Sequence, residues 1–182
     1  MSQVNADKIA PSTGTTLTLG DAGDTITTAA TLAGTLSNTP AFSVCTNAVT
    51  NITAATSTLI VLDREIFDSA SAFASNRFTV PAGEGGKYFI SASIAFLMAS
   101  SSTTSNMQTM IYLNGSEHGT SDSVITNQSN ITNLTVDGTW ILNLAAADYI
   151  ELWGYVSGTS TQYNGNATKQ KTHMSGFKLL GV

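Results

Sequence analysis

The segment GTWILNLAAADYIELWGYV, residues 138–156, decides the fold class of this chain. Apolar and polar residues alternate over 139–144 and again over 149–156, and this period of two is typical of β-strands with one buried face. The residues between them, 145–148, could form a single helical turn, but we interpret them as a loop that joins two strands. The segment therefore predicts β structure.

The same alternation recurs on both sides of this segment. It is visible in residues 42–44, 60–62, 88–94, 107–113 and 175–180. Asn114-Gly115 directly follows one of these runs and is a strong signal for a tight hairpin turn. Many short strands at this spacing indicate a sandwich, a jelly roll or a barrel. We therefore expect one all-β domain over residues 39–182.

Charged residues are unusually rare in this chain. They make up 10% of its 182 residues, against about 25% in an average soluble domain. The net charge of −5 opposes a nucleic-acid-binding surface, which needs clustered Lys and Arg. Hydrophobic residues reach 42%, which opposes a disordered chain. The composition is that of a β domain with uncharged polar surfaces, or of a closely packed assembly.

The single cysteine, Cys45, cannot form a disulfide within the chain. We interpret it as a small buried hydrophobic residue rather than a functional thiol. The longest apolar-leaning stretch, 90–99, contains two serines and is far shorter than the ~20 residues of a membrane-spanning helix. The first residues contain no apolar run, so we expect neither a signal peptide nor membrane insertion.

Residues 1–38 form a leader that is rich in Thr, Gly and Ala. Its aliphatic residues are too sparse to build a core within one chain. We expect Leu17, Leu19 and Ile26 to pack against the same residues of other copies, in a docking arm or a short β-rich stalk. A disordered arm is the alternative, and composition alone does not decide between the two.

Four groups of motifs follow one another along residues 40–182. They are AFSV at 41–44; Phe67 with FTVPAG at 78–83 and GKYFI at 86–90; IYLNG at 111–115 with GTWILNL at 138–144 and DYIELW at 148–153; and SGFKLL at 175–180. In this order they resemble the globular head of complement component 1q and the related tumour-necrosis-factor-like jelly rolls. The resemblance implies an all-β fold, a jelly-roll β-sandwich head with a short extended N-terminal arm.

Two positions depart from the pattern of these families. Gly86 falls two residues later after Pro81 than the family spacing, so the turn between them is enlarged. Ala147-Asp148 stands where the families have Gly-Asp before the second strand of a late hairpin. The first departure affects a loop and the second a turn residue, so neither breaks the strand pattern.

The resemblance also implies a homotrimer with aromatic side chains packed about a three-fold axis. Carried over to this sequence, it places Tyr88, Tyr149 and Phe177 nearest the axis. The alternative is that these aromatic residues belong to the core of each single chain. The low charge agrees with a trimer, because like charges that repeat around an axis repel one another.

The leader has a resemblance of its own. Residues 6–26, with their short Thr- and Gly-rich pieces, resemble leader segments of bacteriophage tail fibres and other phage structural proteins. This implies a virion protein that is assembled in the host cytoplasm and lies on the virion surface. Other virion proteins, of the capsid or the tail, would then bind the N-terminal arm.

No catalytic or metal-binding pattern stands out in the sequence. His118 and His173 are the only histidines, and they do not have metal-ligand spacing. Asp63, Glu65 and Asp68 come closest to an acidic cluster, which we interpret as a solvated strand edge rather than a calcium site. We therefore expect no enzyme activity, no catalytic residue, no metal and no cofactor.

The expected function is that of a phage structural protein: a short trimeric fibre, a spike or a capsid decoration protein that aids attachment to the host surface or to glycans. The segments 100–106, 115–135 and 157–172 are expected to be the outward loops, because they are polar and rich in Asn, Ser and Thr. The alternatives are a tail-fibre receptor-binding protein, a polysaccharide-acting enzyme and a soluble lectin-like ligand.

Overall fold

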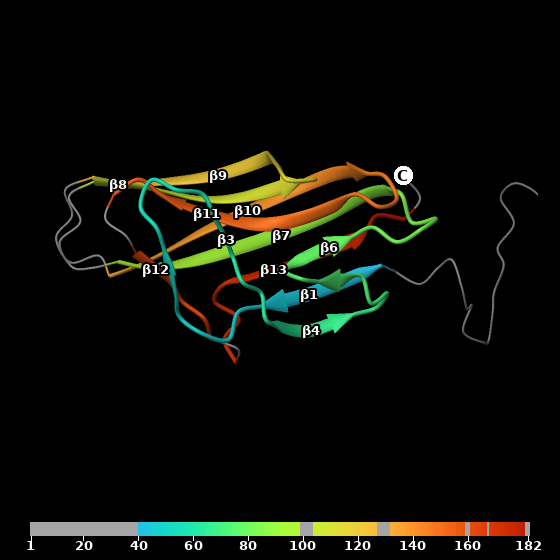
Figure 1. The fold of residues 1–182 in the computed structure, drawn as a ribbon, viewed down its shortest axis with the longest axis horizontal. Helices are drawn as coiled ribbons and strands as arrows, with labels where there is room; N and C mark the ends of the chain where they lie inside the picture. The colour runs from blue at the N-terminus through green and yellow to red at the C-terminus, as the bar shows by residue number, and fades with distance from the viewer. Residues whose placement is uncertain (1–39, 99–103, 127–131, 159–160, 167, 181–182) are drawn as a thin grey trace, which may run out of the picture. The chain divides into compact units, whose positions relative to one another are not determined.

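The computed structural model describes residues 40–98, 104–126, 132–158, 161–166 and 168–180 (Figure 1). Leu17, Leu19 and Ile26 lie outside these ranges, as does the whole expected arm. The strands are β1 (Ala41–Cys45), β2 (Thr50–Ile52), β3 (Thr58–Leu59), β4 (Arg64–Asp68), β5 (Phe73–Ala74), β6 (Arg77–Thr79), β7 (Gly86–Leu97), β8 (Thr104–Leu113), β9 (Ser116–Thr126), β10 (Asn133–Leu144), β11 (Tyr149–Val156), β12 (Thr161–Tyr163) and β13 (His173–Lys178). The described residues form no helix, which confirms the all-β prediction.

The strands form two antiparallel sheets that face one another. In sheet A, β7 pairs along one side with β10 and along the other with β13, which is followed by β1 and β4. The last residues of β7 pair with β12, which pairs in turn with β2. Sheet B has the order β5-β6-β11-β8-β9, and β3 lies beside the second half of β11. This arrangement is a β-sandwich in which strands that follow one another along the chain often belong to different sheets, as the jelly-roll prediction requires.

The deciding segment forms two strands as predicted, but they are not a hairpin. β10 pairs with β7 in sheet A, whereas β11 pairs with β3, β6 and β8 in sheet B. Residues 145–148 therefore form a connection from one sheet to the other. Alternation alone cannot distinguish the two cases, because a strand of either sheet has one face on the core.

Asn114-Gly115 forms the predicted hairpin turn between β8 and β9. Both residues have positive φ, 51° and 81°, which is the conformation of a type I′ turn. The strand that follows the turn corrects the expected loop over 115–135, because 116–126 is β9 and 133–144 is β10. β9 is an edge strand of sheet B, and a polar sequence is tolerated there because an edge strand buries little.

The other corrected segments are shorter. The expected loop over 157–172 contains β12, and part of the expected loop over 100–106 belongs to β8. Residues 60–62 alternate as predicted, with Ile60 and Leu62 buried and Val61 exposed. They follow β3 without being part of a strand, and the Ile60 N–H donates a hydrogen bond to the Leu152 carbonyl of β11. Alternation of apolar and polar residues indicates which side chains are buried, and a segment can alternate in this way without being a strand of a sheet.

The core lies between the two sheets and is rich in rings. Phe42 of sheet A stacks on Phe78 of sheet B, with ring centroids 4.4 Å apart, and Phe78 also contacts Tyr88. Cys45 is fully buried as predicted, and burial raises the pKa of its thiol. The fully buried large side chains come from both sheets: Tyr88, Tyr163, Phe42, Phe78, Phe96, Ile52, Ile60, Ile90, Ile94, Met107, Met110 and Ile111.

Trp140 lies over two glycines from opposite sheets. A Cβ atom at Gly138 of β10 would be 2.0 Å from the Trp140 ring, and one at Gly119 of β9 would be 2.4 Å from its Nε1 atom. β9 and β10 are the edge strands of sheet B and sheet A, so the indole occupies the space between the sheets along this side of the sandwich. A side chain at either glycine would displace it.

The sandwich has two distinct ends. At the base, which we define by residues 40 and 178, the Lys178 N–H donates a hydrogen bond to the Pro40 carbonyl. At the tip, which we define by Leu97 and Thr104, β7 ends and β8 begins. In Figure 1 the start of β1 and the end of β13 lie at one end of the domain, and β12 and the start of β8 lie at the other. The chain therefore enters the domain at its base.

Candidate functional site

The outer face of sheet A carries large apolar side chains that no other part of the described chain covers. The strand register places Ile141 opposite Phe89 and Phe89 opposite Phe177, so these residues form a line across β10, β7 and β13. Phe177 is opposite Ala41 of β1. Phe67 of β4 is opposite Ser43 of β1, in the neighbouring line of the register, and it lines the same hollow as Phe89 and Phe177. We call the four large residues the apolar row: Phe67, Phe89, Ile141 and Phe177.

The apolar row is substantially exposed. Phe67 is 50% and Ile141 is 66% exposed, while Phe89 and Phe177 stack on one another with ring centroids 5.2 Å apart. The surface between the rings is a hollow of about 330 Å³ lined by Ala41, Phe42, Ser43, Phe67, Phe89, Ser175, Gly176 and Phe177. Large exposed apolar areas on a folded domain mark interaction sites. This hollow is therefore the first candidate site.

The next line of side chains on the same face is small and uncharged. The register places Thr139, Ser91, Ser175 and Ser43 opposite one another on β10, β7, β13 and β1. We call this line the hydroxyl row. Short side chains let another surface approach closely, and hydroxyl groups can both donate and accept hydrogen bonds. None of the residues in the two rows carries a charge.

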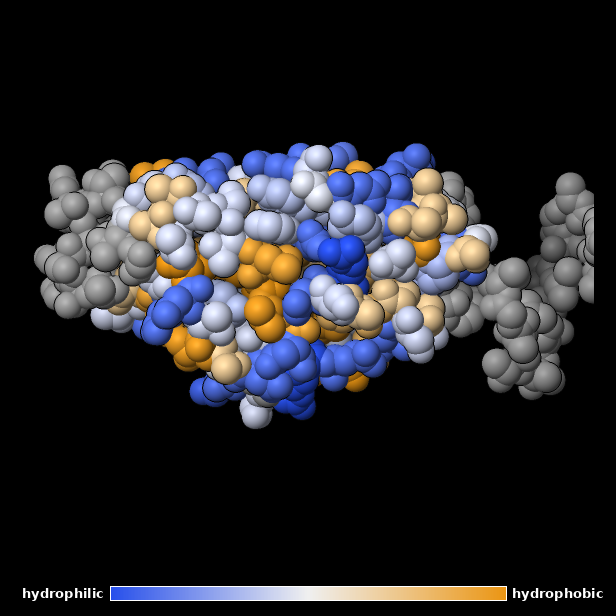
Figure 2. Space-filling model, viewed as in Figure 1, coloured by the Kyte–Doolittle hydropathy of each residue, from blue (hydrophilic) through white to orange (hydrophobic). Residues whose placement is uncertain are grey.

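Figure 2 shows a second hydrophobic area in the middle of the visible face, near the segment that joins β3 to β4 in Figure 1. Val61 of this segment is 40% exposed, and Ile66 of β4 is 38% exposed. Hydrophilic side chains surround the area in Figure 2.

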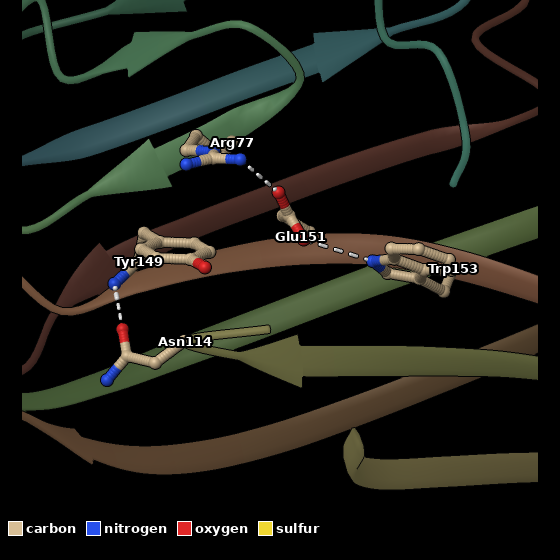
Figure 3. A network of polar contacts seen from close by, with 5 residues as sticks. All are labelled: Arg77, Asn114, Tyr149, Glu151 and Trp153. Atoms are coloured by element: carbon tan, nitrogen blue, oxygen red, sulfur yellow. Dashed lines mark hydrogen bonds and ion pairs between the residues drawn. The ribbon is translucent and has the colours of Figure 1, made fainter. Parts of the chain in front are cut away.

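The outer face of sheet B is aromatic as well, but its polar atoms are paired with one another (Figure 3). Glu151 of β11 is only 4% exposed, and its Oε1 atom lies 2.8 Å from Nη2 of Arg77. The Trp153 Nε1–H donates a hydrogen bond of 3.2 Å to the other carboxylate oxygen. The Arg77 guanidinium lies 4.2 Å from the Tyr149 ring centroid, and Trp153 stacks on Tyr112. The Glu151 carboxylate is thus satisfied within the chain.

A polar clamp holds the base of sheet B. The Asn114 side chain donates a hydrogen bond to Asp148 and accepts one from the Tyr149 N–H. Asp148 also accepts the Ala145 N–H, and these hydrogen bonds, the Asn114 one first, lower the pKa of its carboxyl group. Ala147 adopts a φ of 71° in this turn. That left-handed conformation suits the glycine that the resembling families have at this position.

The three predicted axis residues lie in three different places. Phe177 belongs to the apolar row, Tyr149 lies on the outer face of sheet B, and Tyr88 is fully buried in the core. The Tyr88 hydroxyl donates to the Glu84 carbonyl, and burial, followed by the Glu84 charge, raises its pKa to about 12. A side chain without exposed surface cannot contact another copy, so the placement of Tyr88 differs from the expectation.

Sequence reasoning did not single out Phe89 and Ile141 as surface residues. A signal was nevertheless available, because the core positions of β7 and β10 are even-numbered. Phe89 and Ile141 are apolar residues at the odd-numbered positions of these strands, which alternation assigns to the opposite face. Phe67 offered no such signal, since the β1–β4 register shifts between Ser43 and Val44.

The titratable residues considered from the sequence serve the local structure. The Asp63 carboxylate accepts the Asn47 N–H, and Asp68 accepts the N–H groups of Ala70 and Phe73. His173 lies 2.8 Å from the Gln170 carbonyl through Nδ1. Within the described ranges no three His, Cys, Asp or Glu residues are grouped as metal ligands would be. The described part of the chain also contains no helix long and apolar enough to cross a membrane.

Several solved structures share this arrangement of strands. The globular domain of zebrafish complement 1qA aligns with a TM-score of 0.50 and 15% identity, over 77% of this chain and 96% of its own. The fold is a complement 1q and tumour necrosis factor jelly roll. Murine APRIL aligns with a TM-score of 0.54 and 10% identity, over 76% of this chain and 98% of its own. The Eiger tumour necrosis factor of S. frugiperda aligns with a TM-score of 0.51 and 12% identity, over 78% and 93%.

These similarities confirm the jelly-roll prediction. No protein-family model matches the sequence, and no curated protein matches it. At 10 to 15% identity the complement 1q and tumour necrosis factor jelly rolls share the fold with this chain, and function requires a separate argument from the surfaces.

Proposed function

We propose that this chain is a bacteriophage structural protein whose jelly-roll head forms a homotrimer on the virion surface and aids attachment to the host. The observation that carries the homotrimer is the apolar row with its 330 Å³ hollow on the outer face of sheet A. Burial of a large apolar side chain is favourable by about 1.5–3 kcal/mol. Four such side chains in every copy supply a driving force for self-association.

Symmetry makes another copy of this chain a suitable partner for the row. Charges near a symmetry axis are repeated in every copy, and their repulsion opposes assembly. The apolar row and the hydroxyl row carry no charge. A trimer built on this face would also bring the three copies of residue 40 toward one another, because β1 begins beside Phe177.

The virion role is supported by the leader and not by the head. Residues 6–26 resemble leader segments of phage fibres, whereas the jelly roll is common to proteins of many functions. A soluble ligand is the second candidate, because the similar structures include complement and tumour-necrosis-factor proteins. Capsid, portal or tail genes beside the gene for this chain would favour the virion role over the soluble ligand.

Sedimentation equilibrium of the full chain tests the assembly. We expect a species of three times the chain mass of 18.9 kDa at micromolar concentration. A species of one chain mass over the whole concentration range would overturn the homotrimer. Immunogold labelling of intact particles tests the location, with label on capsid faces or on the tail distinguishing decoration protein from tail fibre. Particles without label would overturn the virion role.

A further inference from the structure

A second and larger hollow lies at the tip of the sandwich, far from the apolar row. It has a volume of about 550 Å³ and is lined by Asn51, Ile52, Thr53, Leu97, Met98, Thr161 and Gln162. These residues come from β2, from β12 and from the end of β7. Phe89 and Leu97 are eight positions apart on β7, which corresponds to about 26 Å along a strand. The hollow is therefore a separate feature of the surface.

The lining of this tip hollow is polar but uncharged. Asn51 and Gln162 are opposite one another on β2 and β12, and the Gln162 Nε2–H donates a hydrogen bond of 2.9 Å to Asn51 Oδ1. This bond uses Asn51 Oδ1 and one Nε2–H of Gln162, so the Asn51 Nδ2–H₂ group and Gln162 Oε1 remain for a ligand. A side-chain amide provides donors and an acceptor in one plane. Thr53 adds a hydroxyl group at the same hollow.

One side of the tip hollow is aliphatic. Leu97 is opposite Gln162 in the ladder between β7 and β12, and Met98 follows it. Both side chains are half-buried and line the hollow. A ligand that fits this lining must combine hydroxyl or amide groups on one side with C–H groups on the other. Charged groups fit poorly, because a partly enclosed charge without an opposite charge loses solvation.

We infer that the tip hollow is a binding site for a neutral oligosaccharide. A sugar ring has hydroxyl groups that donate and accept at its edge, which the Asn51 and Gln162 amides can match. It also has a C–H surface, which can contact Leu97 and Met98. A volume of about 550 Å³ lies within the range of small-ligand sites. The inference rests on the proposed attachment role and gives that role a place and a ligand class.

Saturation-transfer NMR with the full chain tests the inference. The probes are lactose, maltotriose and N,N′-diacetylchitobiose as neutral sugars, with 3′-sialyllactose as the charged comparison. We expect at least one neutral probe to bind with a Kd of about 1 mM, a typical weak affinity for a small surface site. We expect 3′-sialyllactose to bind no better than lactose.

Paired variants locate the binding. Gln162→Ala and Asn51→Ala each remove one amide from the tip hollow and are expected to weaken binding at least tenfold. Gln108→Ala is the matched control, because Gln108 is an amide on sheet B that donates to Asp122, and it is expected to leave binding unchanged. Circular dichroism of each variant shows whether the β fold is retained.

The outcomes separate this inference from the proposed function. No saturation transfer from any neutral probe at about 10 mM would overturn it, as would equal binding by the folded Gln162→Ala chain and the unchanged chain. Preference for the sialylated probe would also overturn it. Sugar binding by a chain that sediments as a monomer would uphold the tip site and remove the trimer. A trimer that binds none of the sugar probes would uphold the homotrimer and overturn the tip site.

Discussion

The outer faces of the two sheets use aromatic residues in opposite ways. On sheet B, the Glu151 carboxylate pairs with Arg77 and Trp153, and Arg77 covers the Tyr149 ring. On sheet A, Phe89 and Phe177 stack side by side and leave Phe67 and Ile141 exposed. On the first face, the buried carboxylate has its partners within one chain. The second gains stability only when another surface covers it.

The difference shows that aromatic content alone does not identify an interface. A ring whose neighbours are charged or amide groups of the same chain already has partners, as Tyr149 and Trp153 do. A ring whose only neighbours are other apolar side chains on an exposed face lacks that compensation.

The largest effect is expected from charges in the apolar row. The double substitution Phe89→Glu and Phe177→Glu removes two rings per copy, each contributing about 1.5–3 kcal/mol if buried by association, and it adds charges that repel around an axis. We expect sedimentation to change from a trimer to a monomer while the β spectrum is kept. Val124→Glu is the control, because Val124 is 61% exposed on β9. A double variant that stays trimeric would contradict the role of the row.

A smaller effect is expected from breaking the pairing on sheet B. Arg77→Met keeps most of the side-chain length but leaves the Glu151 carboxylate, 4% exposed, without its cation. Because the Arg77 side chain is itself 41% exposed, we expect a loss of about 2 kcal/mol in the free energy of unfolding, below the cost of a fully buried pair. Urea denaturation measures it.

A second substitution, at Glu151, tests whether the unpaired carboxylate causes this loss of stability. Glu151→Gln removes the charge and keeps a group that can accept the Trp153 N–H. Combined with Arg77→Met, it should restore about half of the lost stability, since no unpaired charge remains buried. If the double variant is less stable than Arg77→Met alone, the ion pair is not the source of the loss. Association should be the same in all these variants.

In the turn between the two sheets, residues 145–148, we expect a substitution that increases stability. Ala147 has a φ of 71°, which is costly for a residue with a Cβ atom and costs glycine nothing. Ala147→Gly is therefore expected to raise the free energy of unfolding by about 0.5–1 kcal/mol, after the greater chain entropy of glycine is included. Ala146→Gly is the matched control and should be destabilising. A loss at Ala147→Gly would contradict the strained turn.

The smallest expected effect is on the pH dependence of stability, through Asp148 in the same turn. Hydrogen bonds from Asn114 and from the Ala145 N–H lower the pKa of Asp148 below its ordinary value of 3.8. A carboxyl group whose pKa is lowered by folding stabilises the fold above its ordinary pKa, and this contribution is lost as the pH falls through the lowered value. Asp148→Asn should therefore lower the melting temperature at pH 7 and have little effect near about pH 2. An equal effect at both pH values would contradict the prediction.

Much of the fold could be predicted from the sequence because alternation reports which side chains are buried. It located β7, β10 and β11, and the Asn114-Gly115 signal located the turn at the end of β8. The sheet to which a strand belongs could not be predicted, since β10 and β11 alternate alike and enter different sheets. β9 was missed because polar residues at a sheet edge have the composition of a loop.

The surfaces were harder to predict than the strands. Phe177 was assigned to an interface through a family resemblance. It lies in the apolar row, and its place at a trimer axis stays a prediction. Tyr88 was assigned in the same way, and it is in the core. A family resemblance matches positions along two sequences. Whether the matched side chain is on the surface or in the core depends on the face of the strand to which it belongs in this sandwich. The tip hollow combines residues from three strands distant in sequence, and no local pattern indicated it.

Trp140 also constrains how this sequence can change over generations. Its indole needs the absence of a side chain at Gly119 and at Gly138, which belong to different sheets. A single mutation to a larger residue at either glycine is therefore selected against as long as the tryptophan is present. Replacement of the tryptophan by a smaller residue leaves a void until a glycine also changes. The three positions should accordingly vary together among descendants, and a substitution at one should be tolerated only in the background of another.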